Sequence, residues 1–544
     1  MTFLLSFVIA LSVTVVLMPP LIRAAYRLGF VDVPDARKVH VKSIPRIGGI
    51  AMGVGTVLAM VLWRGEAPEI VPVLAGIVVI LVFGGLDDRF NLGYRVKFFG
   101  QLIAALIVMF YGDVLIERLL FWDSDPLPKA FSIPFTLFAL LGVTNAVNLS
   151  DGLDGLAGGV TLLSLGAIAV LAWMGGGYGV AIIAVAVMGS IFGFLRFNTH
   201  PAQVFMGDAG SQLLGFTAGV LAIVLTQRVE PSLSTVTALF LLGLPIIDTM
   251  MVMGNRVREG RSPFSPDKNH IHHRLLALGF DHYEAVLIIY VAQAGLVASG
   301  FYFRHYSDAL LLAAGGLFCF AVLAGFRWAA RTGWRFHGRA VGEVGTLISG
   351  RIRWLRETVR ITRWVFGYVL ASILAYVALA VSFGDQVSRD LGVIALVFFV
   401  VMLITYLGRR GEPFGMVERA GLYIVSALAV YLGHSQAGTT AWLGVCDKVF
   451  FALLAVAVVV AVIYCWKDRF DLTPLDFLVL FMALMVPFVP GEYFQSLDQR
   501  LGVLKLIVLF YAGELVLYRF GRQADALRLI TMAGFAAVGV RGLL

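Results

Sequence analysis

The residues that could do chemistry gather in five short segments between long apolar runs of this 544-residue chain. In segment 145–159, Asn145, Asn148, Asp151 and Asp154 follow one another at intervals of three, so neighbouring pairs share a helix face. The glycines that follow let the backbone approach a ligand closely. Amide and carboxylate oxygens suit a hard cation such as Mg²⁺, and the spacing differs from that of an EF-hand. This segment therefore predicts a magnesium site.

Two adjacent carboxylates, Asp87 and Asp88, stand at the end of another apolar run. Charges near a bilayer are costly unless they are paired or bind a cation. Like charges side by side also raise the pKa of one of them, which suits a proton acceptor. Lys97, in the first turn of the next expected helix, can pair with an aspartate or bind a lipid phosphate. We therefore predict that this pair takes part in catalysis.

Segment 198–211 carries one aspartate, Asp208, between Gly207 and Gly210. The glycines leave its carboxylate uncrowded, and an aspartate at this place can cap the helix that follows. Beside the Asn and Asp segment, a Mg²⁺ ligand is the better interpretation, because Mg²⁺ typically takes one or two protein carboxylates together with waters and substrate phosphates.

Two basic segments could hold phosphate groups, because arginine, lysine and histidine all donate hydrogen bonds to phosphate oxygens. The first contains Arg37, Lys38, His40 and Arg46, and the second contains His270, His272, His273 and Arg274. Zinc is an alternative for the histidine cluster. Zinc sites, however, usually include cysteine or two histidines four residues apart on a helix, and no cysteine lies nearby. Diphosphate binding is therefore the favoured interpretation.

Membrane helices are expected to position these segments. The chain is 59% hydrophobic and 14% charged, with a mean hydropathy of +0.89, whereas soluble domains are about a quarter charged. Apolar runs of about 20 residues predict an all-α, polytopic membrane bundle of about 11 spans within residues 1–330. The predicted spans are 1–22, 47–63, 70–86, 98–116, 131–149, 156–174, 178–196, 211–227, 234–253, 284–302 and 308–326.

Alternating the side of each connection places all five segments on one face of the bundle. Most lysines and arginines of this region fall on the same face, so the positive-inside rule assigns that face to the cytoplasm. The net charge of +8 reflects this asymmetry and does not indicate nucleic-acid binding. We expect a multi-pass protein of the inner (plasma) membrane whose active site is cytoplasmic.

The rest of the chain is different in kind. Residues 331–364 are rich in arginine and predict a basic cytoplasmic connector that meets anionic lipid. Residues 365–544 predict a C-terminal membrane extension of about seven spans, with no motif of catalytic type. These spans are 365–383, 391–408, 419–434, 448–466, 474–489, 501–518 and 526–543.

In order and spacing, the five segments resemble those of the polyprenyl-phosphate N-acetylhexosamine-1-phosphate transferase family, glycosyltransferase family 4. The resemblance covers residues 1 to about 330. The His-Ile-His-His form of 270–273 resembles the bacterial branch that uses undecaprenyl phosphate and, as usual donor, UDP-N-acetylglucosamine to initiate cell-surface polysaccharide synthesis. The peptidoglycan branch, which transfers phospho-MurNAc-pentapeptide, carries a different histidine motif and is the alternative within the family.

The resemblance also implies roles for individual residues. Asn148 and Asp208 would hold Mg²⁺, with Mn²⁺ as a substitute, on the diphosphate of a UDP-sugar. Asp87 or Asp88 would orient or deprotonate the polyprenyl phosphate, or act as the nucleophile of a two-step route. Further catalytic residues would be Asp151 and Asp154. Substrate-binding residues would be Arg37, Lys38, His40, Arg46, Lys97, Asn145, Asn198, His270, His272, His273 and Arg274.

A membrane transporter is the alternative from another class, because it too combines many spans with polar residues. Transporters place ionisable groups near the membrane midplane in broken helices. Here the polar residues cluster at span ends on one side, which favours an enzyme. The expected partners are a UDP-sugar donor, undecaprenyl phosphate and the membrane, with a homodimer or downstream pathway enzymes as further candidates.

Overall fold

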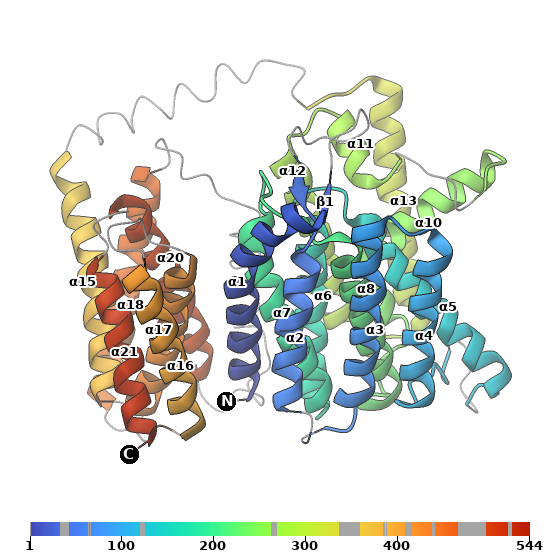
Figure 1. Cartoon of the computed structure of the whole chain (residues 1–544). Coiled ribbons are helices and arrows are strands. Elements are labelled where there is room, and N and C mark those ends of the chain that lie inside the picture. The colour runs from blue at the N-terminus through green and yellow to red at the C-terminus, as the bar shows by residue number, and fades with distance from the viewer. Residues whose placement is uncertain are drawn as a thin grey trace. The chain divides into compact units, whose positions relative to one another are not determined.

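The protein is all-α, as the sequence predicts, apart from one short β-hairpin (Figure 1). The computed structural model describes residues 2–32, 43–63, 65, 67–119, 126–262, 269–336, 359–383, 387, 389–408, 416–437, 441–465, 497–520 and 525–543. The chain divides near residue 340 into two compact units. Among the described residues, 11 helices are long and apolar enough to cross a membrane, which confirms a polytopic membrane protein.

The first unit contains the hairpin and all the segments singled out above. Its elements are α1 (Thr2–Leu28), β1 (Val31–Asp32), β2 (Ile44–Pro45), α2 (Gly48–Leu62), α3 (Ile70–Phe90), α4 (Tyr94–Phe110), α5 (Lys129–Ser150), α6 (Leu156–Met174), α7 (Tyr178–Asn198), α8 (Gly207–Val224), the π-helical turn η1 (Leu225–Val229), α9 (Thr237–Leu241), α10 (Gly243–Arg258), α11 (Ile271–Ala277), α12 (His282–Tyr302) and α13 (Asp308–Thr332).

Helix α8 forms the centre of this unit. Its residues from Ala209 to Val224 are all buried, and it packs against α2, α3, α5 and α6. Glycine and alanine are frequent along α8, and small residues let membrane helices approach closely. The start of α8 is therefore held rigidly among the ends of its neighbours, and Asp208 lies in this first turn.

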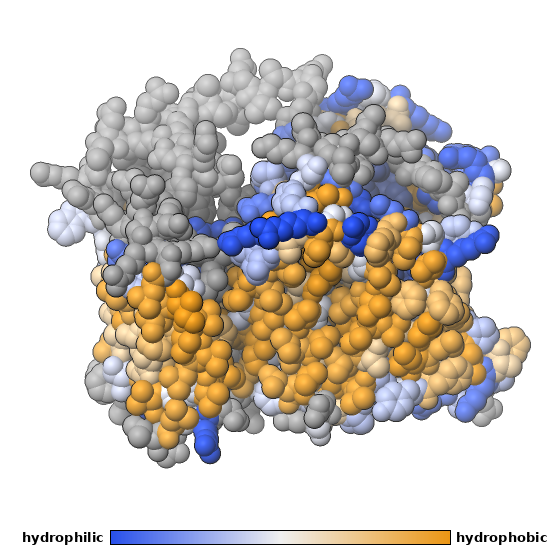
Figure 2. All heavy atoms as spheres, viewed as in Figure 1, coloured by the Kyte–Doolittle hydropathy of each residue, from blue (hydrophilic) through white to orange (hydrophobic). Residues whose placement is uncertain are grey.

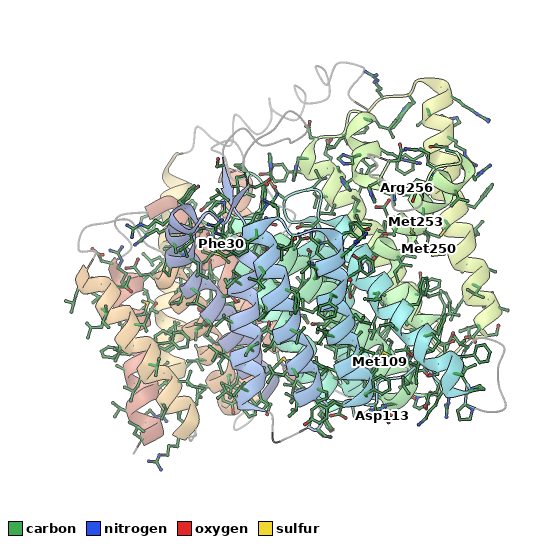
Figure 3. All side chains as sticks on the ribbon, turned by 45° about the vertical axis from the view of Figure 1, so that its right-hand side comes forward. Phe30, Met109, Asp113, Met250, Met253 and Arg256 are labelled. Carbon is green, nitrogen blue, oxygen red and sulfur yellow. The ribbon has the colours of Figure 1, made fainter. Side chains whose placement is uncertain are left out.

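The two ends of the first unit differ in polarity. Figure 2 shows apolar side chains over the middle of the helices and a border of hydrophilic side chains along one end. Phe30 and Arg256 lie at this end, whereas Met109 and Asp113 lie at the other (Figure 3). We call the end that holds Phe30 and Arg256 the polar end. Because successive helices alternate in direction, the last turn of α3 and the first turn of α8 meet there.

The predicted span 234–253 is wrong as a continuous helix, because the chain breaks between α9 and α10. Pro245 has no N–H to donate to the carbonyl of Leu241, so a helix cannot continue unchanged through this point. Gln293 of α12 satisfies the freed groups: its amide nitrogen donates to Leu241 O at 2.9 Å, and its amide oxygen accepts from Leu244 N at 2.9 Å. A side chain thus stabilises the break, as irregular backbone at membrane depth requires.

The second unit consists of apolar helices. They are α15 (Val359–Phe383), α16 (Arg389–Gly408), α17 (Met416–Ala437), α18 (Ala441–Cys465), α20 (Leu497–Phe520) and α21 (Asp525–Leu543). Six of the seven predicted spans of the extension correspond to these helices, and the seventh, 474–489, lies outside the described residues. Most of the predicted connector 331–364 also lies outside them.

Candidate active site

Two aspartates from different helices share one lysine at the polar end. Lys97 Nζ, in the first turn of α4, lies 2.8 Å from Asp87 Oδ2 and 2.6 Å from Asp208 Oδ2. The other oxygen of Asp87, Oδ1, is buried and has no hydrogen-bond partner among the described residues. Buried polar atoms in proteins nearly always have one. The cluster therefore carries more negative charge than Lys97 balances, and it leaves one buried acceptor for a cation or a ligand proton.

Asp88 has a different environment from its neighbour Asp87. Its two carboxylate oxygens accept hydrogen bonds from the backbone N–H groups of Asp208, at 2.7 Å, and Ala209, at 3.0 Å. N–H groups in the first turn of a helix have no carbonyl partner within the helix, and negative charge is favourable at that end. Gly207 has a φ of +67°, and a Cβ there would lie 2.5 Å from the Asp88 carboxylate, so only glycine fits. Asp88 thus fixes the start of α8, and Asp208 lies inside the first turn rather than capping it.

Asn148, at the end of α5, is in direct contact with Asp208. Its amide nitrogen donates to Asp208 Oδ1 and to Ser211 Oγ, each at 2.7 Å. The two residues predicted to bind Mg²⁺ are therefore adjacent, but the amide nitrogen of Asn148, not its carbonyl oxygen, faces the carboxylate. In this arrangement Asn148 orients Asp208.

Asn145 lies one turn earlier on α5 and belongs to a chain of buried amides. It donates to Gln101 Oε1 at 2.8 Å, and Gln101 donates to Gln212 Oε1 at 3.0 Å. This chain links α5, α4 and α8 beneath the carboxylates. Sequence reasoning missed both glutamines, although a lone glutamine inside an apolar helix is the signal that could have found them.

Asp151, just after α5, lies near the carboxylate cluster and responds to its charge. Burial, together with the negative charges of Asp208 and Asp154, raises the pKa of Asp151 to about 7, while the charge of Arg46 limits the rise. A carboxyl group with such a pKa can accept or release a proton near neutral pH. Asp151 is therefore chemically suited to the catalytic role predicted for it.

Asp154 faces a pair of histidines that sequence reasoning did not single out. His200 Nδ1 lies 2.7 Å from Asp154 Oδ2, and the rings of His200 and His282 are stacked with centroids 4.0 Å apart. Among the described residues, these three form the group whose ligand atoms are close enough, within 4.8 Å, to share a metal. A shared metal needs ring nitrogens directed at one point, whereas stacked rings direct theirs side by side. The geometry is that of a hydrogen-bonded cluster.

Asn198, predicted to bind substrate, is buried, and both the oxygen and the nitrogen of its side-chain amide form hydrogen bonds with the protein backbone. Its oxygen accepts from Gly155 N, and its nitrogen donates to Val204 O, both at 2.8 Å. These bonds tie segment 145–159 to segment 198–211. The geometry favours a positioning role for Asn198 over the predicted substrate contact.

His270 is held by an aspartate that the sequence analysis overlooked. Asp248 is on α10. Its Oδ2 atom lies 2.8 Å from His270 Nδ1, and its Oδ1 atom accepts a hydrogen bond from Ile271 N at 2.9 Å. Both side chains are buried. Asp248 therefore caps α11 and fixes the orientation of the histidine ring. A single aspartate within an otherwise apolar run was the available signal.

The rest of the histidine cluster meets segment 145–159. The ring of His272 lies against the backbone of Gly152, where a side chain would collide with it. Burial lowers the pKa of His272 to about 4, so this ring is neutral at pH 7. The ring centroids of His273 and His272 are 4.2 Å apart. Arg274 Cζ lies 5.6 Å from the centroid of the Phe326 ring of α13.

The first basic segment is described only in part. Arg46 forms an ion pair with Asp32 across the β1–β2 hairpin. Phe205 N donates to Pro45 O at 2.8 Å, which joins the hairpin to segment 198–211. The remaining predicted residues, Arg37, Lys38 and His40, lie outside the described residues.

Comparison with known proteins agrees with this geometry. The model of the family described as Glycosyl transferase family 4 matches residues 70–226. A protein of Bacillus subtilis (strain 168), named as a probable undecaprenyl-phosphate N-acetylglucosaminyl 1-phosphate transferase, is 38% identical over 293 residues, which cover 53% of this chain and 80% of that protein. The undecaprenyl-phosphate alpha-N-acetylglucosaminyl 1-phosphate transferase of Yersinia pestis is 34% identical over 51% of this chain and 78% of its own length.

The matching region carries the site. Residues 70–226 include Asp87, Asp88, Lys97, Asn148 and Asp208, which the structure brings together around the start of α8. The alignments with the two relatives cover about half of this chain. The chain belongs to glycosyl transferase family 4, among the undecaprenyl-phosphate N-acetylhexosamine 1-phosphate transferases.

Proposed function

We propose that this transferase moves N-acetylglucosamine 1-phosphate from UDP-N-acetylglucosamine to undecaprenyl phosphate, releases UMP and so initiates a cell-surface polysaccharide at the cytoplasmic face of the plasma membrane. The observation that carries the proposal is the shared lysine: Lys97 joins Asp87 and Asp208, while Asp87 Oδ1 is buried and has no hydrogen-bond partner within the described part of the chain. A site at the polar end also lets a lipid phosphate meet a water-soluble nucleotide while the prenyl chain stays in the bilayer.

The carboxylate cluster suits a divalent cation. Asp87 and Asp208 would hold Mg²⁺, since carboxylate oxygens are its preferred ligands and no described residue donates to Asp87 Oδ1. Asn148 would keep Asp208 in place through its 2.7 Å hydrogen bond. When bound, Mg²⁺ would neutralise charge on the diphosphate of the donor.

The reaction needs one bond to form and one to break. An oxygen of the polyprenyl phosphate attacks the β-phosphorus of the donor, and the bond from that phosphorus to the bridging oxygen breaks, so that UMP leaves with the electron pair. A phosphate monoester has a second pKa of about 6 and is already mostly a dianion at pH 7. The acceptor therefore needs positioning more than deprotonation, and direct attack is the simpler route.

The chain's own residues would do that positioning. Lys97 would bind the acceptor phosphate, and Asp87 would hold the Lys97 side chain in place through their ion pair. Asp88 is a poor candidate for a nucleophile, because both of its oxygens accept hydrogen bonds from the start of α8. His270, held by Asp248, would donate to the phosphates or the sugar of the donor.

A UMP-release assay with a panel of donors tests the proposal. Purified full-length protein in detergent would receive undecaprenyl phosphate, Mg²⁺ and, in separate reactions, UDP-GlcNAc, UDP-GalNAc or UDP-MurNAc-pentapeptide. We expect UMP release with UDP-GlcNAc that requires both the lipid and the cation. Release with the pentapeptide donor instead would favour the peptidoglycan alternative, and no release from folded protein with any donor would refute the proposal.

A further inference from the structure

A groove on the outer surface of the first unit has no role in the transfer described above. It lies between the ends of α1 and α3 at the polar end and has a volume of about 550 Å³. Its lining includes Arg27, Leu28, Phe30, Leu86, Arg89 and Phe90.

The groove has one apolar wall that continues down α3. Val82, Leu86 and Phe90 follow one another at intervals of four, so they form a stripe along one face of the helix. Their side chains are 52%, 42% and 61% exposed. Such a stripe on a membrane helix faces hydrocarbon and offers a surface for an acyl chain.

The upper end of the groove is positively charged. Arg27 and Arg89 line it, and the described residues include no acidic side chain in its lining and no ion-pair partner for either guanidinium. Arg89 is held in place: a Cβ at Gly29, whose φ is +77°, would lie 3.1 Å from Arg89 Cζ, and the guanidinium lies 5.2 Å from the Phe90 ring centroid. Glycine at position 29 therefore leaves the space that this guanidinium fills.

The groove lies on the opposite side of α3 from the site. Asp87 and Asp88 are 4% exposed and face α4 and α8. Asp88 is two residues from Leu86, which on a helix places the two side chains about 200° apart. A headgroup bound between Arg27 and Arg89 is thus separated from the reacting carboxylates by the helix itself, which argues against the acceptor lipid as its occupant.

We infer that this groove binds an anionic phospholipid, with its phosphate between Arg27 and Arg89 and an acyl chain along Val82 and Leu86. Two arginines in a lining that, among the described residues, contains no acidic side chain complement a phosphate headgroup, and arginine suits phosphate oxygens through its fork of N–H groups. The inference does not depend on the proposed transferase reaction.

Native mass spectrometry of the full-length protein in detergent tests this. Phosphatidylglycerol and phosphatidylcholine with the same acyl chains would be titrated separately. We expect a preference for phosphatidylglycerol that the double variant Arg27→Gln, Arg89→Gln weakens by about tenfold or more, since each basic side chain contributes measurably to binding anionic lipid. The matched control, Arg95→Gln with Arg331→Gln, removes the same charge from exposed sites outside the groove and should change binding less than about twofold.

Three results would overturn the inference. They are equal binding of both phospholipids by the unaltered protein, unchanged binding in the groove variant, and displacement of phosphatidylglycerol by equimolar undecaprenyl phosphate, which would assign the groove to the acceptor. Both guanidinium groups are exposed, so the groove variant should fold, and its melting temperature without added lipid checks this.

Discussion

The two units of this protein bury charge in opposite ways. In the second unit, three basic side chains each lie against an acidic one. The pairs are Arg528 with Glu418 at 2.9 Å, Arg419 with Glu514 at 3.2 Å, and Lys505 with Asp447. In the first unit, Lys97 alone serves Asp87 and Asp208, and Asp88 and Asp151 lie close by.

This difference between the units distinguishes charged side chains that stabilise the fold from charged side chains that are available to bind a ligand. A buried base beside one buried acid is satisfied within the fold, and the second carboxylate that contacts Arg528, that of Asp525, is exposed to solvent. Two buried carboxylates around one lysine carry excess negative charge, and a proton, a cation or a basic ligand group reduces the energetic cost of that excess. The first unit therefore has the charge pattern of a site, while the described pairs of the second unit have that of a scaffold.

The largest expected effect is on catalysis in the first unit. Asp208→Asn should lower the rate of UMP release by about a thousandfold, because it removes a charge proposed to act on the reacting phosphates. Its melting temperature should change little, since the new amide keeps one oxygen as partner for Lys97, and Asn148 can turn its own carbonyl oxygen toward the new NH₂ group. Glu514→Gln in the second unit is the matched control and should retain activity. Equal losses in the two variants would mean that the units do not differ as described.

The second unit should respond in stability rather than in rate. Glu418→Gln removes the buried carboxylate beside Arg528 and leaves its buried guanidinium with only the exposed carboxylate of Asp525. Breaking such a pair costs about 3 kcal/mol of the free energy of unfolding. Denaturant unfolding in detergent would measure the loss, and UMP release per folded molecule should stay near that of the unaltered protein. An unchanged unfolding midpoint would show that this pair is not a structural element.

A substitution of Asp248 tests whether the site includes residues beyond those in contact with Lys97. Asp248→Asn should lower kcat/KM for the donor by about tenfold or more, because the ring of His270 loses the carboxylate that orients it. We expect the change mainly in the KM for UDP-sugar, with little change in melting temperature. Asp113→Asn, at the opposite end of the unit (Figure 3), is the control. A loss of stability with unchanged KM would make Asp248 a structural cap only.

The smallest expected effect concerns the break between α9 and α10. Gln293→Met would leave Leu241 O and Leu244 N without partners in a buried place. We expect the free energy of unfolding to fall by about 2 kcal/mol. Gln227→Met removes the hydrogen bonds of a half-buried amide to the backbone of Glu117 and Arg118, where water can replace the lost partner, so it should cost less than about 1 kcal/mol. If both substitutions cost the same, the break does not depend on Gln293.

The sequence was sufficient for the fold class, and it singled out the carboxylates that the structure brings together around Lys97. Apolar runs are long enough to reveal most helices, and carboxylates such as Asp87 and Asp208 stand out at their ends. The helix break at Pro245 could not be predicted from hydropathy, because the segment is one continuous apolar run and hydropathy does not depend on whether a residue has a backbone N–H.

Other site residues were hidden because their partners are distant in the sequence. Asp248 becomes significant only when His270, 22 residues later, folds onto it. Likewise, Gln101 and Gln212 are 111 residues apart and read as isolated polar residues within apolar helices. The distinct environments of Asp87 and Asp88 also depend on where α8 begins, which adjacent positions in a sequence cannot reveal.

The most direct test of the account is isotope exchange between labelled UMP and UDP-GlcNAc, catalysed by the purified full-length protein with Mg²⁺. Direct attack by the lipid phosphate predicts exchange only when undecaprenyl phosphate is present, and its loss in Asp208→Asn. Exchange without the lipid would contradict direct attack and indicate a covalent intermediate on the protein. Exchange undiminished in Asp208→Asn would contradict the central claim that the carboxylates around Lys97 are the transferase site.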